Sequence, residues 1–255
     1  MIRGLYTAAS GMLAQMSRTD VISSNLANVN TTAFKKDTVI FQALEEMRIR
    51  RVDDPILAGP RMTIDPRPYI GNLGSGVDVG QIYTQFEQGP IKDTSNPLDL
   101  ALQGTGFFTV IIPDGIRYTR DGSFSRSSNG YLVTREGHMV MGQNGPILLP
   151  ENATIKINED GEIFSDGQRL DQLMLVSFAD LQQLVKVGDN LYSSDQEPQQ
   201  AQPRVIQGAL ETANANAVTE MVNLIEAFRA YEASQKLVVT HDNLLDKAVN
   251  EIARK

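Results

Sequence analysis

The chain has 255 residues, of which 23 are basic and 31 are acidic, giving a formal net charge of −8. No cluster of basic residues stands out, which argues against a nucleic-acid groove. The chain has no cysteine, so disulfides, thiolate catalysis and cysteine-ligated zinc are excluded. No apolar run approaches the roughly 20 residues of a membrane span, and polar residues interrupt the segment after Arg3. Neither a membrane span nor a cleaved signal peptide is therefore expected.

Residues 2–28 are predicted to form a long helix. The segment has neither proline nor lysine, and its apolar residues recur at three- and four-residue steps. The residues with this spacing are Leu5, Ala8, Ala9, Met12, Leu13, Met16, Ile22 and Leu26. Its only charges are Arg3, Arg18 and Asp20, so most of the helix circumference should be covered by other protein.

The predicted helix leads into a polar motif at residues 25–36, which reads Asn-Leu-Ala-Asn-Val-Asn-Thr-Thr-Ala-Phe-Lys-Lys. Asn and Thr side chains compete with the backbone for hydrogen bonds. The helix should therefore end near Asn28 and be followed by a turn.

Residues 37–94 are expected to form an irregular connector. One or two helical turns are predicted through Phe41, Leu44 and Met47, and the prolines and glycines that follow make regular structure unlikely before Val77. A structureless stretch of ~20 residues is rare inside a compact domain, so this part should pack against neighbouring subunits or order on assembly. Alternating side chains predict a strand over residues 77–86.

The middle of the chain, residues 96–205, is predicted to be rich in β-strands. The clearest strands are expected at residues 107–112 and 173–178. Asn-Gly or Asp-Gly pairs, which suit tight hairpin turns, occur at 114–115, 121–122, 129–130, 144–145, 160–161 and 166–167. This spacing predicts a meandering antiparallel sheet or a small barrel, with the Gln- and Pro-rich residues 193–203 as the exit loop.

A second long helix is predicted over residues 216–255. No glycine or proline follows Gly208, and either Asn214 or Asn216 could cap the first turn. Apolar residues again recur at helical spacing, namely Val218, Met221, Val222, Ile225, Phe228, Leu237, Leu244, Leu245, Ala248 and Ile252. The predicted fold class is therefore α+β, with the terminal helices paired as a coiled-coil-like unit and an antiparallel β-rich middle domain.

No catalytic, cofactor-binding or metal-binding residues are predicted. Residues 158–161 hint at a calcium loop, but Lys156 and Gly167 then stand where acids are required, and a hairpin turn is the preferred interpretation. The glycine pair at 104 and 106 lacks the third glycine of a dinucleotide site. His138 and His241 lie in different predicted units, so a catalytic dyad is not expected.

Three motifs in the chain resemble those of flagellar rod and hook proteins, the axial components of the bacterial flagellum. The first is residues 25–36, and the second is Asn-Pro-Leu-Asp-Leu-Ala-Leu-Gln-Gly-Thr-Gly-Phe-Phe at 96–108 with its continuations at 118–124 and 130–134. The third is Gln-Gly-Ala-Leu-Glu-Thr-Ala-Asn-Ala-Asn at 207–216, which continues to residues 229–232. They follow the family's order, so the resemblance covers essentially the whole chain.

Two departures from the family pattern follow the first helix. Ser24 stands where the family commonly has Asn, and Ala33 where it commonly has Gly. The second departure puts in doubt only the local backbone conformation, because Ala tolerates positive φ poorly.

The resemblance implies a structural subunit of the flagellar basal-body rod, self-assembled through its terminal helices into a helical tube that transmits torque from motor to hook. The length fits the longer rod proteins, and the opening residues 1–8 favour the type at the proximal–distal junction over the distal rod. The implied partners are further copies of the chain, other rod and hook axial proteins, the flagellar export apparatus and, in a Gram-negative cell, the surrounding bushing rings. The implied location is the periplasmic rod of the basal body, reached by export without a cleaved signal peptide.

The resemblance also implies three domains. Residues 1–30 with 214–255 would form a terminal helical assembly domain, residues 31–95 an extended connector, and residues 96–207 a β-rich outer domain. The assembly interface is expected at Leu5, Met12, Met16, Leu26, Asn28, Asn30, Phe34, Met221, Ile225, Phe228, Tyr231 and Leu245.

The alternative function is a secreted β-rich enzyme that acts on cell-wall glycan. A β-rich domain with many acids could present the paired carboxylates of a glycosidase. No such pair stands out in a setting that would raise one pKa, so the structural function is preferred.

Overall fold

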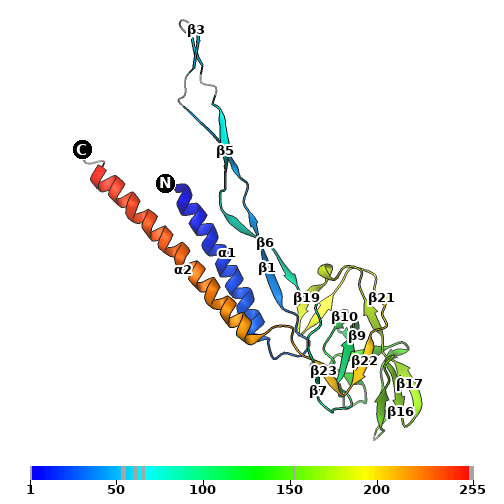
Figure 1. The fold of residues 1–255 in the computed structure, drawn as a ribbon. Coiled ribbons are helices and arrows are strands. Elements are labelled where there is room, and N and C mark those ends of the chain that lie inside the picture. Colours follow the sequence, from blue (N-terminus) through cyan, green and yellow to red (C-terminus); the bar gives the residue numbers. More distant parts are fainter. Residues whose placement is uncertain (1, 53–55, 60–61, 65–66, 152, 253–255) are drawn as a thin grey trace. The chain divides into compact units, whose positions relative to one another are not determined.

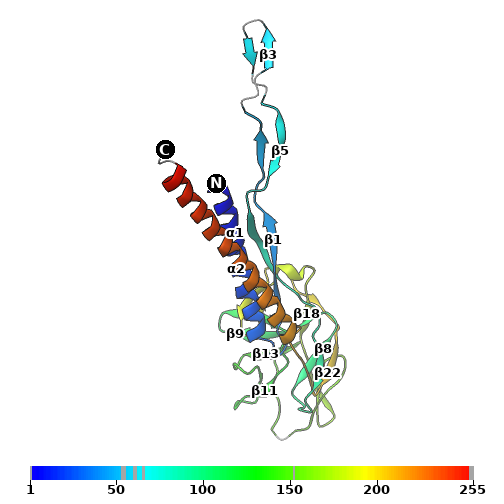
Figure 2. The same cartoon turned by 60° about the vertical axis from the view of Figure 1, so that its left-hand side comes forward.

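The computed structural model describes residues 2–52, 56–59, 62–64, 67–151 and 153–252. The predicted α+β class is confirmed, with one long helix from each end of the chain and an antiparallel β-rich middle (Figures 1 and 2). The chain divides into two compact units. Unit 1 comprises Met1–Ser23, Thr38–Tyr83 and Met221–Lys255, and unit 2 comprises Ser24–Asp37 and Thr84–Glu220. The domain boundaries that the resemblance implies stay a prediction.

Most of both helices belongs to unit 1. They are α1 (Ile2–Ala27) and α2 (Ala217–Lys247), which lie side by side and run in opposite directions (Figures 1 and 2). Of the two candidate caps, Asn216 is the N-cap of α2, because its Oδ1 accepts hydrogen bonds from the N–H groups of Val218 and Thr219. After Lys247 the chain continues as a π-helical turn, Ala248–Ile252. No helix in the described ranges is long and apolar enough to cross a bilayer.

Small residues line the faces that the two helices turn toward each other. A Cβ atom added to Gly4 would lie 2.5 Å from Nε2 of His241, and one added to Gly11 would lie 3.5 Å from Oγ of Ser234. Ala227 of α2 is fully buried, and it precedes Ser234 and His241 at seven-residue intervals. Any larger residue at position 4 would therefore force the His241 ring to move. The predicted coiled-coil-like pairing stays a prediction.

A chain of short antiparallel ladders follows α1. Strand β1 (Asp37–Ala43) pairs with β6 (Val77–Thr84), β2 (Met47–Arg50) with β5 (Tyr69–Leu73), and β3 (Ile56–Gly59) with β4 (Met62–Ile64). We call this segment the ribbon. The strand predicted at residues 77–86 is confirmed as β6.

The irregular connector and the helical turns predicted before residue 77 are wrong for the described part of this segment. Among the described residues, Pro68, Gly74 and Gly76 lie between the ladders, whereas Gly59 and Gly71 lie within strands β3 and β5. The carbonyl oxygen of Pro68 accepts a hydrogen bond from the N–H of Arg51, and that of Gly76 accepts one from Leu44. These hydrogen bonds continue the antiparallel pairing at the ends of neighbouring ladders. The part of the prediction that falls on residues 53–55, 60–61 and 65–66 lies outside the described residues.

Unit 2 is built on a ten-stranded sheet with the main order β11-β12-β13-β9-β10-β20-β19, to which β14, β18 and β21 are attached. Its strands are β9 (Phe107–Ile112), β10 (Gly115–Thr119), β11 (Ser125–Arg126), β12 (Leu132–Val133), β13 (Met139–Gly142), β14 (Gly145–Pro146), β18 (Leu175–Ser177), β19 (Val185–Gly188), β20 (Leu191–Ser193) and β21 (Gln199–Gln200). The predicted strand at 107–112 has the same bounds as β9, and the one at 173–178 contains β18.

Smaller ladders complete unit 2. Strands β15 (Ile155–Ile157), β16 (Glu162–Ser165) and β17 (Gln168–Gln172) form one sheet, β8 (Leu100–Gln103) pairs with β22 (Arg204–Gln207), and β7 (Ile91–Asp93) pairs with β23 (Ala209–Glu211). A 3₁₀ turn covers Leu181–Gln183. Two apolar clusters form the core, one around Phe108 and Phe124 and the other around Phe107, Phe178 and Tyr192.

Five of the six predicted Asn-Gly and Asp-Gly turns connect adjacent antiparallel strands. The exception is Asp121-Gly122, where a Cβ atom on the glycine would lie 1.8 Å from the carbonyl oxygen of Leu100. This glycine is needed for a close backbone approach and not for a hairpin. One tight turn was not predicted, because its two central residues are not followed by glycine. It lies at Asp189 and Asn190 between β19 and β20, where φ is 48° and 54°.

Candidate functional site

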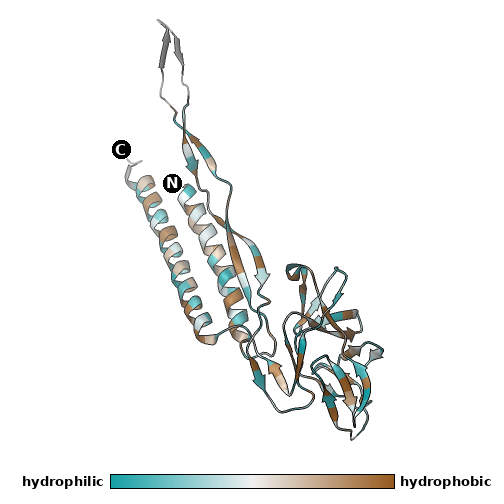
Figure 3. Cartoon of the chain, turned by 45° about the vertical axis from the view of Figure 1, so that its right-hand side comes forward, coloured by the Kyte–Doolittle hydropathy of each residue, from teal (hydrophilic) through white to brown (hydrophobic). Residues whose placement is uncertain are grey.

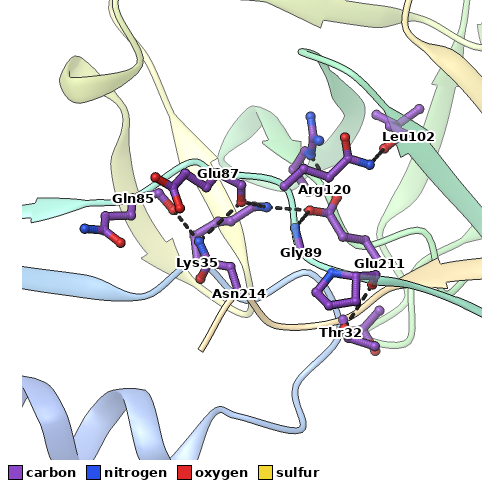
Figure 4. Close-up of polar contacts among 12 residues, drawn as sticks. Thr32, Lys35, Gln85, Glu87, Gly89, Leu102, Arg120, Glu211 and Asn214 are labelled. Atoms are coloured by element: carbon purple, nitrogen blue, oxygen red, sulfur yellow. Dashed lines mark hydrogen bonds and ion pairs between the residues drawn. The ribbon is translucent and has the colours of Figure 1, made fainter. Parts of the chain in front are cut away.

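The three sequence motifs meet at one buried site inside unit 2 (Figure 4). The first motif contributes Lys35, the second Arg120 and the third Glu211. Nζ of Lys35 lies 2.5 Å from Oε1 of Glu211, and Nε of Arg120 lies 3.1 Å from Oε2. The exposed fraction of the side chain is 0% for Lys35 and Glu211 and 5% for Arg120. We call these three residues the charge cluster. Each carboxylate oxygen of Glu211 forms an ion pair with one buried cation.

Backbone groups satisfy the rest of the charge cluster. Nζ of Lys35 also donates to the carbonyl oxygen of Glu87 at 2.7 Å, and the N–H of Gly89 donates to Oε1 of Glu211 at 2.8 Å. The guanidinium of Arg120 donates to the carbonyl oxygens of Gly104 and Gly106, each at 2.8 Å. Carbonyl dipoles therefore supplement the single carboxylate in stabilising two buried cations.

Burial lowers the pKa of Lys35 below its ordinary value, while the Glu211 carboxylate acts in the opposite direction. A lysine with a lowered pKa can act as a base when a substrate can reach it. The amine of Lys35 is instead enclosed by Glu211 and the Glu87 carbonyl and has no exposed surface. The charge cluster is therefore suited to holding chain segments together and not to catalysis.

Two asparagines close the loops beside the charge cluster. Asn25, which is 2% exposed, donates from Nδ2 to the carbonyl oxygen of Asp37 at 2.8 Å and accepts the N–H of the same residue at 2.9 Å. Asn214 accepts the N–H of Lys36 at 2.8 Å and donates to the carbonyl oxygen of Gln85 at 2.7 Å. These amides pair with backbone groups at the start of β1 and in the loops beside it, which explains Asn25 of the first motif and Asn214 of the third.

A polar cavity of about 500 Å³ adjoins the first motif in unit 2, with Asn30, Asp121 and Arg135 in its lining. Burial raises the pKa of the Asp121 carboxyl, and the N–H of Ser123, which donates to its Oδ1 at 2.9 Å, acts against that shift. No group of three or more His, Asp or Glu side chains among the described residues could hold a metal ion. The residues that hint at a calcium loop form the β15–β16 hairpin, where Asn158 bonds both the backbone and the carboxylate of Glu162.

Four of the residues predicted for the assembly interface are exposed apolar side chains on the helices. Met16 of α1 is 55% exposed, and Met221, Ile225 and Phe228 of α2 are 50%, 54% and 50% exposed. Together with Val222, which is also 50% exposed, the α2 residues form a stripe at three- and four-residue steps that we call the α2 stripe. Figure 3 shows hydrophobic positions along both helices. The chain itself leaves this stripe half uncovered.

The other residues predicted for the interface lie deeper. Those that are half-buried are Leu5, Met12, Leu26, Asn28, Tyr231 and Leu245, whereas Asn30 is exposed. The side chain of Asn28 is used locally, since it donates to the carbonyl oxygen of Ser24 and accepts from Thr31. Phe34 corrects the prediction: it is 7% exposed, with Nζ of Lys186 4.8 Å from its ring centre. A side chain that the chain already covers offers no surface to a neighbour.

Comparison with known proteins gives three matches, one for each segment that contributes to the charge cluster. A model described as flagella basal body rod protein matches residues 5–35, one described as flagellar hook protein FlgE/F/G D1 domain matches 101–165, and one described as flagellar basal body rod FlgEFG protein C-terminal matches 206–251.

Relatives that match nearly the whole chain are also flagellar proteins. The flagellar basal-body rod protein FlgG of Borreliella burgdorferi is 36% identical over 269 residues, which cover 98% of each chain. The FlgG of Caulobacter vibrioides is 37% identical, over 96% of this chain and 97% of its own. The chain belongs to the family of flagellar rod and hook proteins. Another member, the flagellar hook-basal body complex protein FlhO of Bacillus subtilis, is 30% identical over the whole of both chains.

Membership of this family makes the chain a structural component of the flagellum and not an enzyme. Rod proteins assemble with other axial components of the flagellum, so surfaces that the isolated chain leaves exposed are the relevant ones. The departure at Ala33 can now be interpreted. Ala33 has φ 55°, is fully buried and donates its N–H to the carbonyl oxygen of Glu211 at 2.8 Å. Ala33 therefore has a left-handed backbone conformation and does not continue the helix.

Replacing Ala33 with the glycine common in the family should change the free energy of unfolding by less than about 1 kcal/mol. Relief of left-handed strain gains ~1–2 kcal/mol. Loss of a buried methyl group costs ~0.8 kcal/mol. The greater conformational entropy of glycine in the unfolded chain costs a further ~0.4–1 kcal/mol. Ala33→Val should instead lose more than about 2 kcal/mol, because a branched side chain is added where neither space nor φ allows it. Urea unfolding checks both variants, and equal effects would contradict this account.

Glu211→Gln should lower the free energy of unfolding of unit 2 by about 3–5 kcal/mol, because it leaves two buried cations without a counter-ion. The double variant Lys35→Met, Glu211→Gln should cost less than the sum of its two single changes. The matched control is Glu159→Gln, which breaks the exposed pair with Arg204 and should cost less than about 1 kcal/mol. Urea unfolding followed by near-ultraviolet circular dichroism measures all four, and strict additivity would refute the coupling.

Asp121→Asn should stabilise unit 2 near pH 7 and lose that advantage in acid. The pKa of Asp121 is raised in the folded state, so its contribution to stability is present below its unfolded pKa of about 3.9 and is lost as the pH rises through the folded pKa. Asparagine still offers Oδ1 to Ser123 but carries no charge to desolvate. Melting temperatures of both proteins from pH 3 to pH 8 give the comparison, and a variant less stable at pH 7 would contradict the buried-carboxylate argument.

Proposed function

We propose that the chain self-assembles through its terminal helices into a helical tube, the rod of the flagellar basal body, and that this tube transmits torque from motor to hook. The observation that carries the proposal is the α2 stripe on a helix whose opposite face already packs. Ala227 is buried, while Ile225 and Phe228 beside it are about half exposed. A helix with apolar residues on both faces requires protein on both sides.

The energetics favour several neighbours over a single partner. Covering the exposed half of one Leu-sized side chain contributes roughly 1 kcal/mol, from ~1.5–3 kcal/mol for full burial. The four residues of the α2 stripe thus supply roughly 4 kcal/mol, at the low end of the ~4–15 kcal/mol that association costs. The stripe of α1, where Tyr6, Leu13 and Met16 are 67%, 67% and 55% exposed, supplies a second contact. A subunit in a tube uses both stripes at once.

The tube geometry follows from the kind of contact. Because the two stripes are different surfaces, a contact between them is heterologous and leaves both ends open to further subunits. Such contacts build helical filaments unless the rotation closes a ring. We infer that the helices pair as a coiled-coil-like unit within each subunit and form the helical assembly domain of residues 1–30 and 214–255. Residues 31–95 would then act as the connector and 96–207 as the outer domain.

The proposed partners are further copies, other rod and hook axial proteins, the flagellar export apparatus and, in a Gram-negative cell, the surrounding bushing rings. The proposed location is the periplasmic rod. Export through the flagellar apparatus and assignment to the proximal–distal junction stay predictions. The charge cluster supports the mechanical part of the proposal, because a subunit that carries torque must resist local opening and the cluster joins segments from the start, middle and end of the chain.

Ile225→Asp should abolish polymerisation while leaving the isolated chain folded. In the free protein the new carboxylate stays in water, whereas in the tube it would be buried without a partner at a cost of several kcal/mol. Thr240→Asp is the matched control, since it adds the same charge to an exposed position of α2 outside the stripe. Electron microscopy of concentrated protein and motility of cells carrying each variant provide the measurement. Normal filaments from Ile225→Asp would refute the proposed interface.

A further inference from the structure

Unit 1 contains an apolar groove beside the α1 stripe, and Tyr6 belongs to both. Its volume is about 610 Å³, and its walls come from the first turns of α1, from α2 and from the ribbon. The apolar side chains in its lining include Tyr6, Met47, Leu73 and Leu237. We call this feature the ribbon groove.

Hydrogen bonds between α1 and the ribbon, and a close contact between α1 and α2, hold the walls of the ribbon groove in place. Oγ1 of Thr7 donates to the carbonyl oxygen of Ser75 at 3.3 Å, and Oγ of Ser10 accepts the N–H of Val77 at 3.3 Å. On the other side, Gly4 lies against the ring of His241. The ribbon and both helices thus form one preformed concavity, which is the shape that an incoming side chain requires.

The surface around the ribbon groove is mostly apolar, and its charged residue is positive. Tyr6 and Leu237 are 67% and 55% exposed although both belong to the lining. Arg3 is exposed and also contributes, and no carboxylate occurs among the residues that the structure places in the lining. A complementary surface is therefore apolar at its centre and acidic at its border.

The α2 stripe has that character. Its residues are large and apolar, and the exposed carboxylates of Glu226 and Glu232 lie between and just after them along the helix. The exposed Arg229 lies between these two residues, so carboxylates outnumber cations along this part of α2 by two to one. We propose that the α2 stripe of a second copy of this chain fills the ribbon groove, with its border carboxylates close to Arg3. This inference rests on the proposed function and specifies which two surfaces meet.

A copy cannot fill its own groove. Ile225 of the stripe and Leu237 of the groove are separated by about 18 Å of the same helix, at 1.5 Å per residue. Stripe and groove therefore meet only between copies, and in a pair of copies one keeps an unused stripe and the other an unused groove. The contact is head-to-tail and continues without limit, as growth of a tube requires.

The absence of native cysteine allows a direct test by disulfide cross-linking. A disulfide forms only when the two Cα atoms come within about 7 Å. The test variant carries Phe228→Cys and Leu237→Cys. The matched control carries Phe228→Cys and Val239→Cys, because Val239 is 54% exposed on α2 but is not in the groove lining. Both proteins are polymerised, oxidised with copper phenanthroline and separated on a non-reducing denaturing gel.

The expected result is a ladder of dimers, trimers and longer species from the test variant and little above monomer from the control. Filaments without the ladder would overturn this inference and leave the proposed function standing, with a different surface or another axial protein in the groove. Ladders of equal strength in both variants would show unspecific collision and would overturn it as well. Failure of the cysteine variants and of the unmodified chain to form any polymer would contradict the proposed function itself.

Discussion

The buried pairing of Glu211 with Lys35 and Arg120 is the interaction on which the rest of the structure depends. It joins residues near the start, the middle and the end of the chain. Bringing residues so distant in sequence together costs loop-closure entropy. A buried ion pair is weak evidence for net stability, but losing one partner is costly. The charge cluster therefore contributes selectivity: few other arrangements of these segments leave all three charges paired.

The charge cluster lies close in sequence to both helices. Lys35 follows shortly after the end of α1, and Glu211 shortly precedes the start of α2. Fixing both residues fixes the polypeptide next to both helices in unit 2, with Asn25 and Asn214 holding the adjoining loops. Within unit 1, small residues such as Gly4 and Ala227 lie where the two helices approach each other. Their remaining apolar faces stay available to other subunits.

Much of the fold follows from local sequence patterns. The α1 and α2 helices were predictable because Gly and Pro are absent from most of their length and because their apolar residues keep a helical period. Five hairpins were predictable because Asn-Gly and Asp-Gly pairs adopt positive φ cheaply. The ribbon was not predictable, since frequent prolines and glycines indicate irregular structure, whereas the pairing of β2 with β5 depends on residues distant in the sequence.

The charge cluster could not be derived from periodicity either. Lys35, Arg120 and Glu211 are ordinary surface residue types, and their burial depends on contacts between distant segments. The motifs marked the three segments without showing that they meet. Phe34 was misplaced for the same reason, because a large aromatic beside a polar turn is equally consistent with an interface and a core. The seven-residue spacing of Ala227, Ser234 and His241 was present in the sequence as a signal for the inner face of α2.

The central claim is that neighbouring subunits cover the outer faces of the terminal helices. Peroxide oxidation of methionine, located by peptide mass spectrometry, tests it on the native chain, because reactivity follows exposure. Met16 and Met221 are 55% and 50% exposed on the helices, and Met174, which is 36% exposed in unit 2, serves as the internal reference. The account predicts that Met16 and Met221 oxidise readily in the free chain and are strongly protected in the polymer relative to Met174. Unchanged relative rates at both helix positions would contradict it.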